Sequence, residues 1–150
     1  MRIIISGASG FVGGALVAHL QNENHEVVRL VRRQPADNAT ERQWDPAASV
    51  LDPSALSGAD VVINLNGRSI SQGRWSAQVK DELRSSRLDA TRTIVEAIAR
   101  TDTPPPLFIS ASATGFYGDR GDESLSERST RGDGFLADLA GDWETAALQG

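Results

Sequence analysis

Short apolar runs alternate with longer amphipathic stretches along the whole chain. Runs rich in β-branched residues predict strands at 2–6, 26–31, 60–65 and 107–110, with a weak strand near Gln43. Helices are expected after residue 10, from about Ser76 to Arg100, and from about Gly134 onward. Strands that alternate with helices of ten or more residues predict right-handed crossovers. The expected fold class is therefore α/β, with a doubly wound parallel sheet.

Apolar side chains at helical spacing define the faces that these helices should bury. Ser76 is the expected N-cap of the long helix, and three prolines from Pro104 prevent its continuation. The expected buried positions are Val12, Leu16 and Leu20 in the first helix, Val79, Leu83, Ala90, Ile94 and Ile98 in the long helix, and Leu136, Leu139 and Trp143 in the last.

A glycine-rich loop with GxxGxxG spacing follows the first strand and opens the first helix. Glycine is needed where the backbone turns tightly and where it meets a pyrophosphate, and the helix N-terminus offers free N–H groups to the phosphates. The alternative is a glycine-rich connection without a ligand. The pattern predicts a dinucleotide site, with contacts from Gly7, Ser9, Gly10, Phe11, Val12 and Gly13.

The end of the second strand indicates which dinucleotide is bound. An NAD site places an acidic residue there to hold the ribose 2′-hydroxyl, whereas this strand ends in Arg32 and Arg33. Guanidinium groups suit a 2′-phosphate, so NADP is predicted rather than NAD. A solvated pair of surface arginines is the alternative.

Two further segments are expected to border the cofactor. Leu65, Asn66 and Gly67 follow the fourth strand, at the edge of the sheet where cofactors bind, although Asn-Gly is also an ordinary turn. Arg87 falls on the apolar stripe of the long helix, where its charge needs an anion or several acceptors. Its partner is either the phosphate or ribose end of the cofactor, or a structural acceptor.

Hydroxyl side chains follow the fifth strand in the segment Ser110–Gly118. The carboxyl ends of parallel strands are where α/β sheets place their chemistry, so Ser112 and Tyr117 are the candidate catalytic residues. A loop that is merely rich in serine and threonine is the alternative. Solvated carboxylates are also the ordinary interpretation of the acidic loop residues Asp119, Asp122, Glu123 and Glu127.

Several segments together resemble one protein family. They are the glycine loop, Val62–Gly67, Arg74-Trp75, Ser86-Arg87, Thr93–Ile98, Ser110–Gly118, Phe135–Ala137 and Trp143-Glu144. The chain is similar over its whole length to atypical extended short-chain dehydrogenases, the epimerase family proteins related to nucleoside-diphosphate sugar epimerases. The resemblance implies a Rossmann fold that binds NAD(P). Asn66 stands where this family usually has alanine, which implies an altered contact.

The usual catalytic pair of short-chain dehydrogenases, Tyr-x-x-x-Lys, cannot form in this chain. Its only tyrosine, Tyr117, is followed four residues later by Gly121, and its only lysine, Lys80, follows Ser76 by four. The resemblance places Phe135 and Leu139 at the positions of the pair, and Arg87 at the position of the helical asparagine. This subgroup is known for lacking the pair.

The composition limits the expected cellular location and the classes of partner. The 150 residues carry a net charge of −5, which argues against a nucleic-acid partner, and they contain no cysteine and no long apolar run. A cytoplasmic protein without a membrane partner is expected, and no metal site is predicted. The chain stops inside a helix, so it is interpreted as an incomplete NADP-binding domain whose substrate-binding half is absent. Self-association through the C-terminal region is expected, because the helix face around Trp143 and one strand edge would lack cover.

Two hypotheses for function stay open. One is an enzyme of nucleotide-sugar epimerase or oxidoreductase type that acts on an unidentified small molecule. The other is a non-catalytic NADP(H)-binding sensor or scaffold protein. The missing proton-transfer pair favours the second hypothesis, and the hydroxyl-rich loop around Ser112 favours the first.

Overall fold

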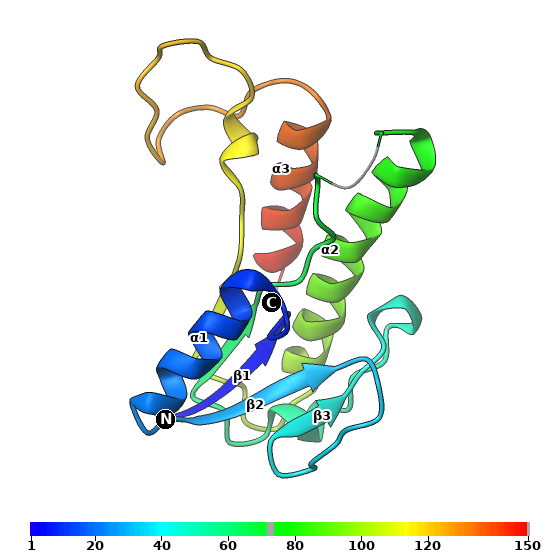
Figure 1. Ribbon diagram of the computed structural model, residues 1–150, viewed down its shortest axis with the longest axis vertical. Coiled ribbons are helices and arrows are strands. Elements are labelled where there is room, and N and C mark those ends of the chain that lie inside the picture. Colours follow the sequence, from blue (N-terminus) through cyan, green and yellow to red (C-terminus); the bar gives the residue numbers. More distant parts are fainter. Residues whose placement is uncertain (72–73, 150) are drawn as a thin grey trace.

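The computed structural model describes residues 1–71 and 74–149, and it contains one five-stranded parallel sheet (Figure 1). The strands lie in the order β3-β2-β1-β4-β5. Their bounds are β1 Arg2–Ser6, β2 Glu26–Val31, β3 Glu41–Gln43, β4 Val61–Asn64 and β5 Leu107–Ser110. The predicted doubly wound sheet is confirmed, and the order reverses between β1 and β4, which is where such sheets bind ligands.

Within the described residues there are three helices and three short 3₁₀ turns, of which η3 and α3 follow the last strand. The helices are α1 Phe11–Asn22, α2 Ala77–Ala99 and α3 Phe135–Ala147, and the turns are η1 Pro46–Ala48, η2 Pro53–Leu56 and η3 Thr114–Tyr117. Ser76 caps α2 as predicted, because its hydroxyl accepts a hydrogen bond from the Val79 N–H at 3.3 Å. No helix in the described part of the chain is long and apolar enough to cross a membrane.

Each face of the sheet has its own apolar core, because successive strand residues point to opposite sides. On one face Ile4, Val28 and Val62 pack with Ala90 and Ile94 of α2, and all five are buried. On the other face the partly buried side chains of α1, Leu16, Val17 and Leu20, cover Ile3, Ile5, Val27, Val61 and Ile63. Helices α2 and α3 lie side by side (Figure 1).

Val12 is not part of the buried stripe of α1, contrary to the prediction. Its side chain is 63% exposed, and Gly13 is the buried residue of this helix. The helix begins at Phe11, four residues after the end of β1, and its first two residues are exposed. The turn is left open on the side where the strands end.

The expectation that Trp143 lacks cover is also wrong. Trp143 is 5% exposed and packs with Leu88 of α2 and Ala146 of α3. The apolar side chains that do lack cover are Leu107 and Ile109 of β5, which are 48% and 44% exposed. Within the described residues β5 pairs with β4 alone, so the outer edge of the sheet is open.

A buried polar network links β1 and β4 to the helices α2 and α3. The Asn64 side chain, at the end of β4, accepts a hydrogen bond from Ser6 Oγ at 2.8 Å and donates one to Thr91 Oγ1 at 2.8 Å. Thr91 Oγ1 also accepts from Trp143 Nε1 at 2.9 Å and donates to the Arg87 carbonyl at 2.8 Å. Ser6, Asn64 and Thr91 are fully buried, so each of these bonds satisfies a group that water does not reach.

Replacing Thr91 by valine is expected to destabilise the protein while preserving the shape of the core. The change removes the acceptor of Trp143 Nε1 and the nearer acceptor of Asn64 Nδ2, which is left with a long contact of 3.4 Å to Ser110 Oγ. Each buried unsatisfied group costs about 1–3 kcal/mol, so the melting temperature should fall by several degrees, at roughly 2–4 °C per kcal/mol. Thermal unfolding followed by circular dichroism measures the change, and Thr103→Val, at an exposed threonine, is the control. Equal melting temperatures for both variants would contradict the role of the network.

Candidate cofactor-binding site

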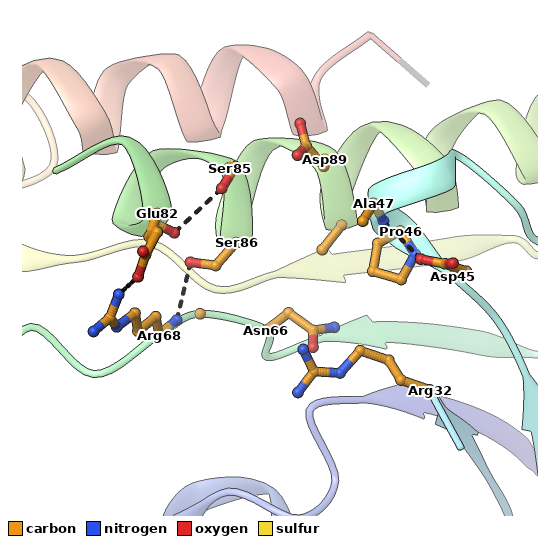
Figure 2. A pocket seen from close by; sticks show the side chains of 12 residues that line it. Arg32, Asp45, Pro46, Ala47, Asn66, Arg68, Glu82, Ser85, Ser86 and Asp89 are labelled. Atoms are coloured by element: carbon orange, nitrogen blue, oxygen red, sulfur yellow. Dashed lines mark hydrogen bonds and ion pairs between the residues drawn. The ribbon is translucent and has the colours of Figure 1, made fainter. Parts of the chain in front are cut away.

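Two adjoining cavities lie at the carboxyl ends of β1, β2 and β4, and Arg32 and Asn66 line both of them. The first, of about 430 Å³, is bounded by Arg32, Asp45, Pro46, Ala47, Asn66, Gly67, Arg68, Glu82, Ser85, Ser86, Asp89 and Ala90 (Figure 2). The second, of about 370 Å³, is bounded by Gly7, Ala8, Ser9, Arg29, Leu30, Val31, Arg32, Arg33, Glu41, Trp44 and Asn66. Together they occupy the point where the strand order reverses.

The three loop glycines meet different requirements. Gly7 has φ +74°, and a Cβ there would lie 2.6 Å from the Leu65 carbonyl group. A Cβ on Gly13 would lie 2.2 Å from the Gly7 oxygen, so α1 can approach the loop only with glycine at this position. A Cβ on Gly10 would meet only that same oxygen, at 3.3 Å. The first and third glycines are therefore required by the fold, whereas a Cβ at the middle one would make a single tight contact that a small shift relieves.

The N-terminus of α1 is open in this structure. Gly10 is its N-cap residue and offers no side chain to accept a hydrogen bond from the first-turn N–H groups. Phe11 and Val12, the first two helical residues, are 99% and 63% exposed. Unpaired N–H groups at the positive end of a helix favour an anion, which fits the pyrophosphate predicted here. Ser9 lines the second cavity next to them.

The two arginines that follow β2 have different surroundings. Figure 2 shows the Arg32 side chain extending beside Asn66, and no ion pair to Arg32 occurs within residues 1–71 and 74–149. Arg33, in contrast, donates two hydrogen bonds of 2.7 Å to the carboxylate of Glu41 on β3. Arg32 is thus the arginine available to an added anion, while Arg33 already holds one.

Glu41 is a buried carboxylate that the sequence analysis did not single out. It is 2% exposed, and besides Arg33 it accepts a hydrogen bond from the Ala36 N–H at 2.8 Å and pairs with Arg29 at 3.1 Å. The hydrogen bonds from Arg33 and Ala36 outweigh its burial and lower the pKa of Glu41 from 4.5 to about 2. The sequence carries no local signal for this pairing, because it depends on the register that places Glu41 beside Arg29 in the sheet.

The segment after β4 lies where the sequence analysis expected it. The Asn66 N–H and the Asn66 side-chain amide both donate to Asn64 Oδ1, at 3.3 and 3.2 Å. Asn66 borders both cavities and Gly67 borders the larger one. Leu65 faces the glycine loop and packs on the core beneath α1. The buried network that holds Asn64 therefore also orients the residues that line the site.

Arg87 has structural acceptors and lies outside both cavities. Its guanidinium donates to the carbonyls of Leu83 and Arg68, each at 3.0 Å, and lies 5.3 Å from the centre of the Trp143 ring. Burial lowers the pKa of Arg87, which makes these acceptors and the ring face important for its charged form. Of the two interpretations left open by the sequence, the contacts favour the structural one. The Arg87 guanidinium also borders Gly67, where a Cβ would lie 3.1 Å from Arg87 Cζ.

The candidate catalytic residues lie apart from these two cavities. Ser112 Oγ donates to a carboxylate oxygen of Glu144 on α3, a partner that the sequence analysis did not predict. Tyr117, in η3, packs edge-on against Phe116, with ring centres 5.3 Å apart. Neither residue contributes to the lining of either cavity.

Phe135, at the tyrosine position that the resemblance implies, lies in an aromatic environment. Its ring is 5.9 Å from that of Trp75, and Lys80 Nζ lies 5.2 Å from the centre of its ring. The only lysine of the chain thus comes close to this position, but from α2 and against a ring face that has no hydroxyl group. Within the described residues no cluster of three or more His, Cys, Asp or Glu side chains could hold a metal ion.

Several residues of the larger cavity were not predicted. They are Asp45, Pro46 and Ala47 after β3, and Arg68, Glu82, Ser85, Ser86 and Asp89 around α2. Asp45 Oδ1 accepts hydrogen bonds from the N–H groups of Ala47 and Ala48, at 3.0 and 3.3 Å, and so caps η1. The Asp-Pro pair could have predicted this turn. Its place in the site depends on a short third strand that the sequence only weakly indicates.

Residues 3–136 match the model of the NAD dependent epimerase/dehydratase family. The chain belongs to this family. It is 44% identical over 144 residues to an epimerase family protein of Mycobacterium tuberculosis, covering 96% of this chain and 47% of the relative. It is 32% identical over 150 residues to the human epimerase family protein SDR39U1, covering 98% of this chain and 49% of the relative. The chain spans about half the length of these curated relatives.

Solved structures of the family have the same fold. The crystal structure of human SDR39U1 with NADPH superposes with a TM-score of 0.86 at 29% identity, over 98% of this chain and 48% of that one. The nucleoside-diphosphate sugar epimerase from Corynebacterium glutamicum has a TM-score of 0.82 at 41% identity, over 99% of this chain and 30% of that one. The resemblance inferred from the motifs is confirmed.

Replacing Gly10 by valine is expected to remove dinucleotide binding without unfolding the protein. Its one close Cβ contact, 3.3 Å to the Gly7 oxygen, needs a shift of only a few tenths of an ångström, whereas the branched side chain would block the pyrophosphate position. Replacing Gly13 by alanine should instead destabilise the fold, because its Cβ would overlap the Gly7 carbonyl. Melting curves recorded with and without NADPH measure both effects. Unchanged binding in Gly10→Val, at an unchanged melting temperature, would show that the loop has only a structural role.

The Glu41 carboxylate predicts a dependence of stability on pH. Its pKa is lowered from 4.5 to about 2 on folding, so the stabilisation is present above pH 4.5 and is lost as the pH falls toward 2. Urea unfolding at pH 7 and at pH 3 should show a smaller loss on acidification in Glu41→Gln than in the unchanged protein. The same loss in both would contradict this contribution of Glu41.

Proposed function

We propose that residues 1–150 form the NADP-binding unit of an atypical short-chain dehydrogenase, a nucleotide-sugar epimerase or oxidoreductase that works without the Tyr-x-x-x-Lys pair. The observation that carries the choice of cofactor is Arg32, which follows β2, lines both cavities and has no anionic partner among the described residues. The crystal structure of human SDR39U1 contains NADPH, which supports the same choice here.

The geometry suggests a place for each part of the cofactor. The pyrophosphate lies at Gly10 and the open N-terminus of α1, and the 2′-phosphate lies against Arg32. The larger cavity takes the adenine, where Asp45 and Asp89 offer carboxylate acceptors for its amino group. The bound nicotinamide would accept or donate a hydride. Ser112 and Tyr117, which follow β5, are the proposed residues at the reacting end.

A non-catalytic NADP(H)-binding sensor or scaffold is the second candidate. Phe135 and Leu139, at the positions of the missing pair, are apolar and favour it, and the only lysine lies against the Phe135 ring. In the complete protein, a polar pocket facing the nicotinamide would support the enzyme, whereas a flat or apolar surface there would support the scaffold. A full-length structure with NADP and any co-purified ligand makes this distinction.

The setting of the protein also belongs to the proposal. A cytoplasmic protein without a nucleic-acid or membrane partner fits the net charge of −5 and the lack of cysteine. Self-association through the C-terminal region stays a prediction. Trp143 is buried and does not support this prediction. The open edge of β5 and the exposed Leu107 and Ile109 support it.

Arg32→Ala is expected to remove the preference for NADPH over NADH. Loss of a charge-assisted contact with the 2′-phosphate should weaken NADPH binding by about tenfold or more and leave NADH binding nearly unchanged. Isothermal titration calorimetry with both cofactors gives the two Kd values, and Arg92→Ala, at an exposed arginine of α2, is the matched control. Equal affinities of the unchanged protein for the two cofactors would argue against NADP.

A further inference from the structure

The two arginines after β2 have different surroundings, because only Arg33 pairs with Glu41. Arg33 approaches the Glu41 carboxylate with both terminal nitrogens at 2.7 Å, the paired geometry in which guanidinium binds carboxylate most strongly. Arg32 lines both cavities and has no such partner within residues 1–71 and 74–149. The sequence Arg32-Arg33 alone does not distinguish these roles.

Arg33 cannot exchange Glu41 for a phosphate without a large cost. Glu41 is 2% exposed, so its charge depends on protein partners rather than on water. The hydrogen bonds from Arg33 are the largest cause of its lowered pKa. A buried carboxylate that loses its partner is strongly destabilising. The contact of Glu41 with Arg29 at 3.1 Å would remain as its single ion pair among the described residues.

The same carboxylate also fixes the backbone beyond Arg33. Glu41 Oε2 accepts from the Ala36 N–H at 2.8 Å, and Arg33 Nη1 also donates to the Gln34 carbonyl at 2.9 Å. Residues 33–36 are thereby tied to β3, immediately after Arg32. Because Glu41 itself lines the second cavity, its charge would repel a phosphate there if Arg33 and Arg29 did not balance it.

We propose that Glu41 is a positioning residue for NADP recognition: it holds Arg33 and the turn up to Ala36, and so leaves Arg32 as the arginine that contacts the 2′-phosphate. This role rests on the proposed function, since only a cofactor with a 2′-phosphate reports on it. Arg33 serves the site by balancing Glu41 rather than by contacting the cofactor.

Cofactor discrimination in Glu41→Gln tests the role. The readout is the Kd of NADH divided by the Kd of NADPH, both measured by calorimetry on the full chain. A general loss of stability does not change this ratio. The ratio is expected to fall about tenfold, through weaker NADPH binding, because the turn after Arg32 loses its anchor. If Arg33 were itself the phosphate ligand, Glu41→Gln would release it, and the ratio would stay the same or rise. Either of these results overturns the proposal.

Variants at Arg33 keep the test valid if Glu41→Gln does not fold. Arg33→Gln should lower the ratio, and Arg33→Lys should lower it too, because lysine cannot form the paired bonds to Glu41. A direct phosphate contact would largely survive in Arg33→Lys, and that outcome also overturns the proposal. Asp142→Asn, which removes the partner of Arg84 between α2 and α3, is the matched control and should leave the ratio unchanged.

The unchanged protein separates failure of this role from failure of the proposed function. A ratio near one in the unchanged protein overturns the NADP assignment and the role of Glu41 together. A clear NADPH preference in the unchanged protein that persists in Glu41→Gln overturns only the role of Glu41, and Arg32→Ala then still tests the cofactor assignment.

Discussion

The hydrogen bonds of the Asn64 side chain hold together the parts of the structure that the site needs. Asn64 ends β4 beside Ser6, which ends β1, and these two strands are where the sheet order reverses. Through Thr91 the same side chain reaches α2 and Trp143 of α3. A polar group in this place is costly unless every partner is present, so the network favours one arrangement of strands and helices. The glycine loop begins directly after Ser6, and the segment 65–67 begins directly after Asn64.

The site depends on how charge is distributed around the second strand. Arg29, Arg32 and Arg33 all line the second cavity, and a single buried carboxylate, Glu41, pairs with two of them. One guanidinium is left for a ligand, in the position where an NAD site carries an acidic residue. The selectivity inferred for NADP thus arises from the third strand as much as from the arginines themselves.

Most of the fold was predictable from the sequence, because apolar periodicity and the glycine loop act locally. The strands, the long helix with its Ser76 cap and the dinucleotide loop all lie where the pattern indicates. The pairing of Arg33 with Glu41, eight residues later, was not predictable, because it depends on the register of a three-residue strand. Trp143 was misjudged for a similar reason, since its cover comes from Leu88 of α2, distant in sequence.

The residues after β5 match the expected chemistry less well than the residues around α1 and β2. At the cofactor end an open helix terminus and an uncompensated arginine each match a known part of the dinucleotide. Beyond β5, the serine that the fold would use for catalysis donates to Glu144, and the aromatic ring at the tyrosine position contacts Trp75 and Lys80. A phenyl ring cannot exchange a proton, so Phe135 cannot take the part of the tyrosine in the usual pair.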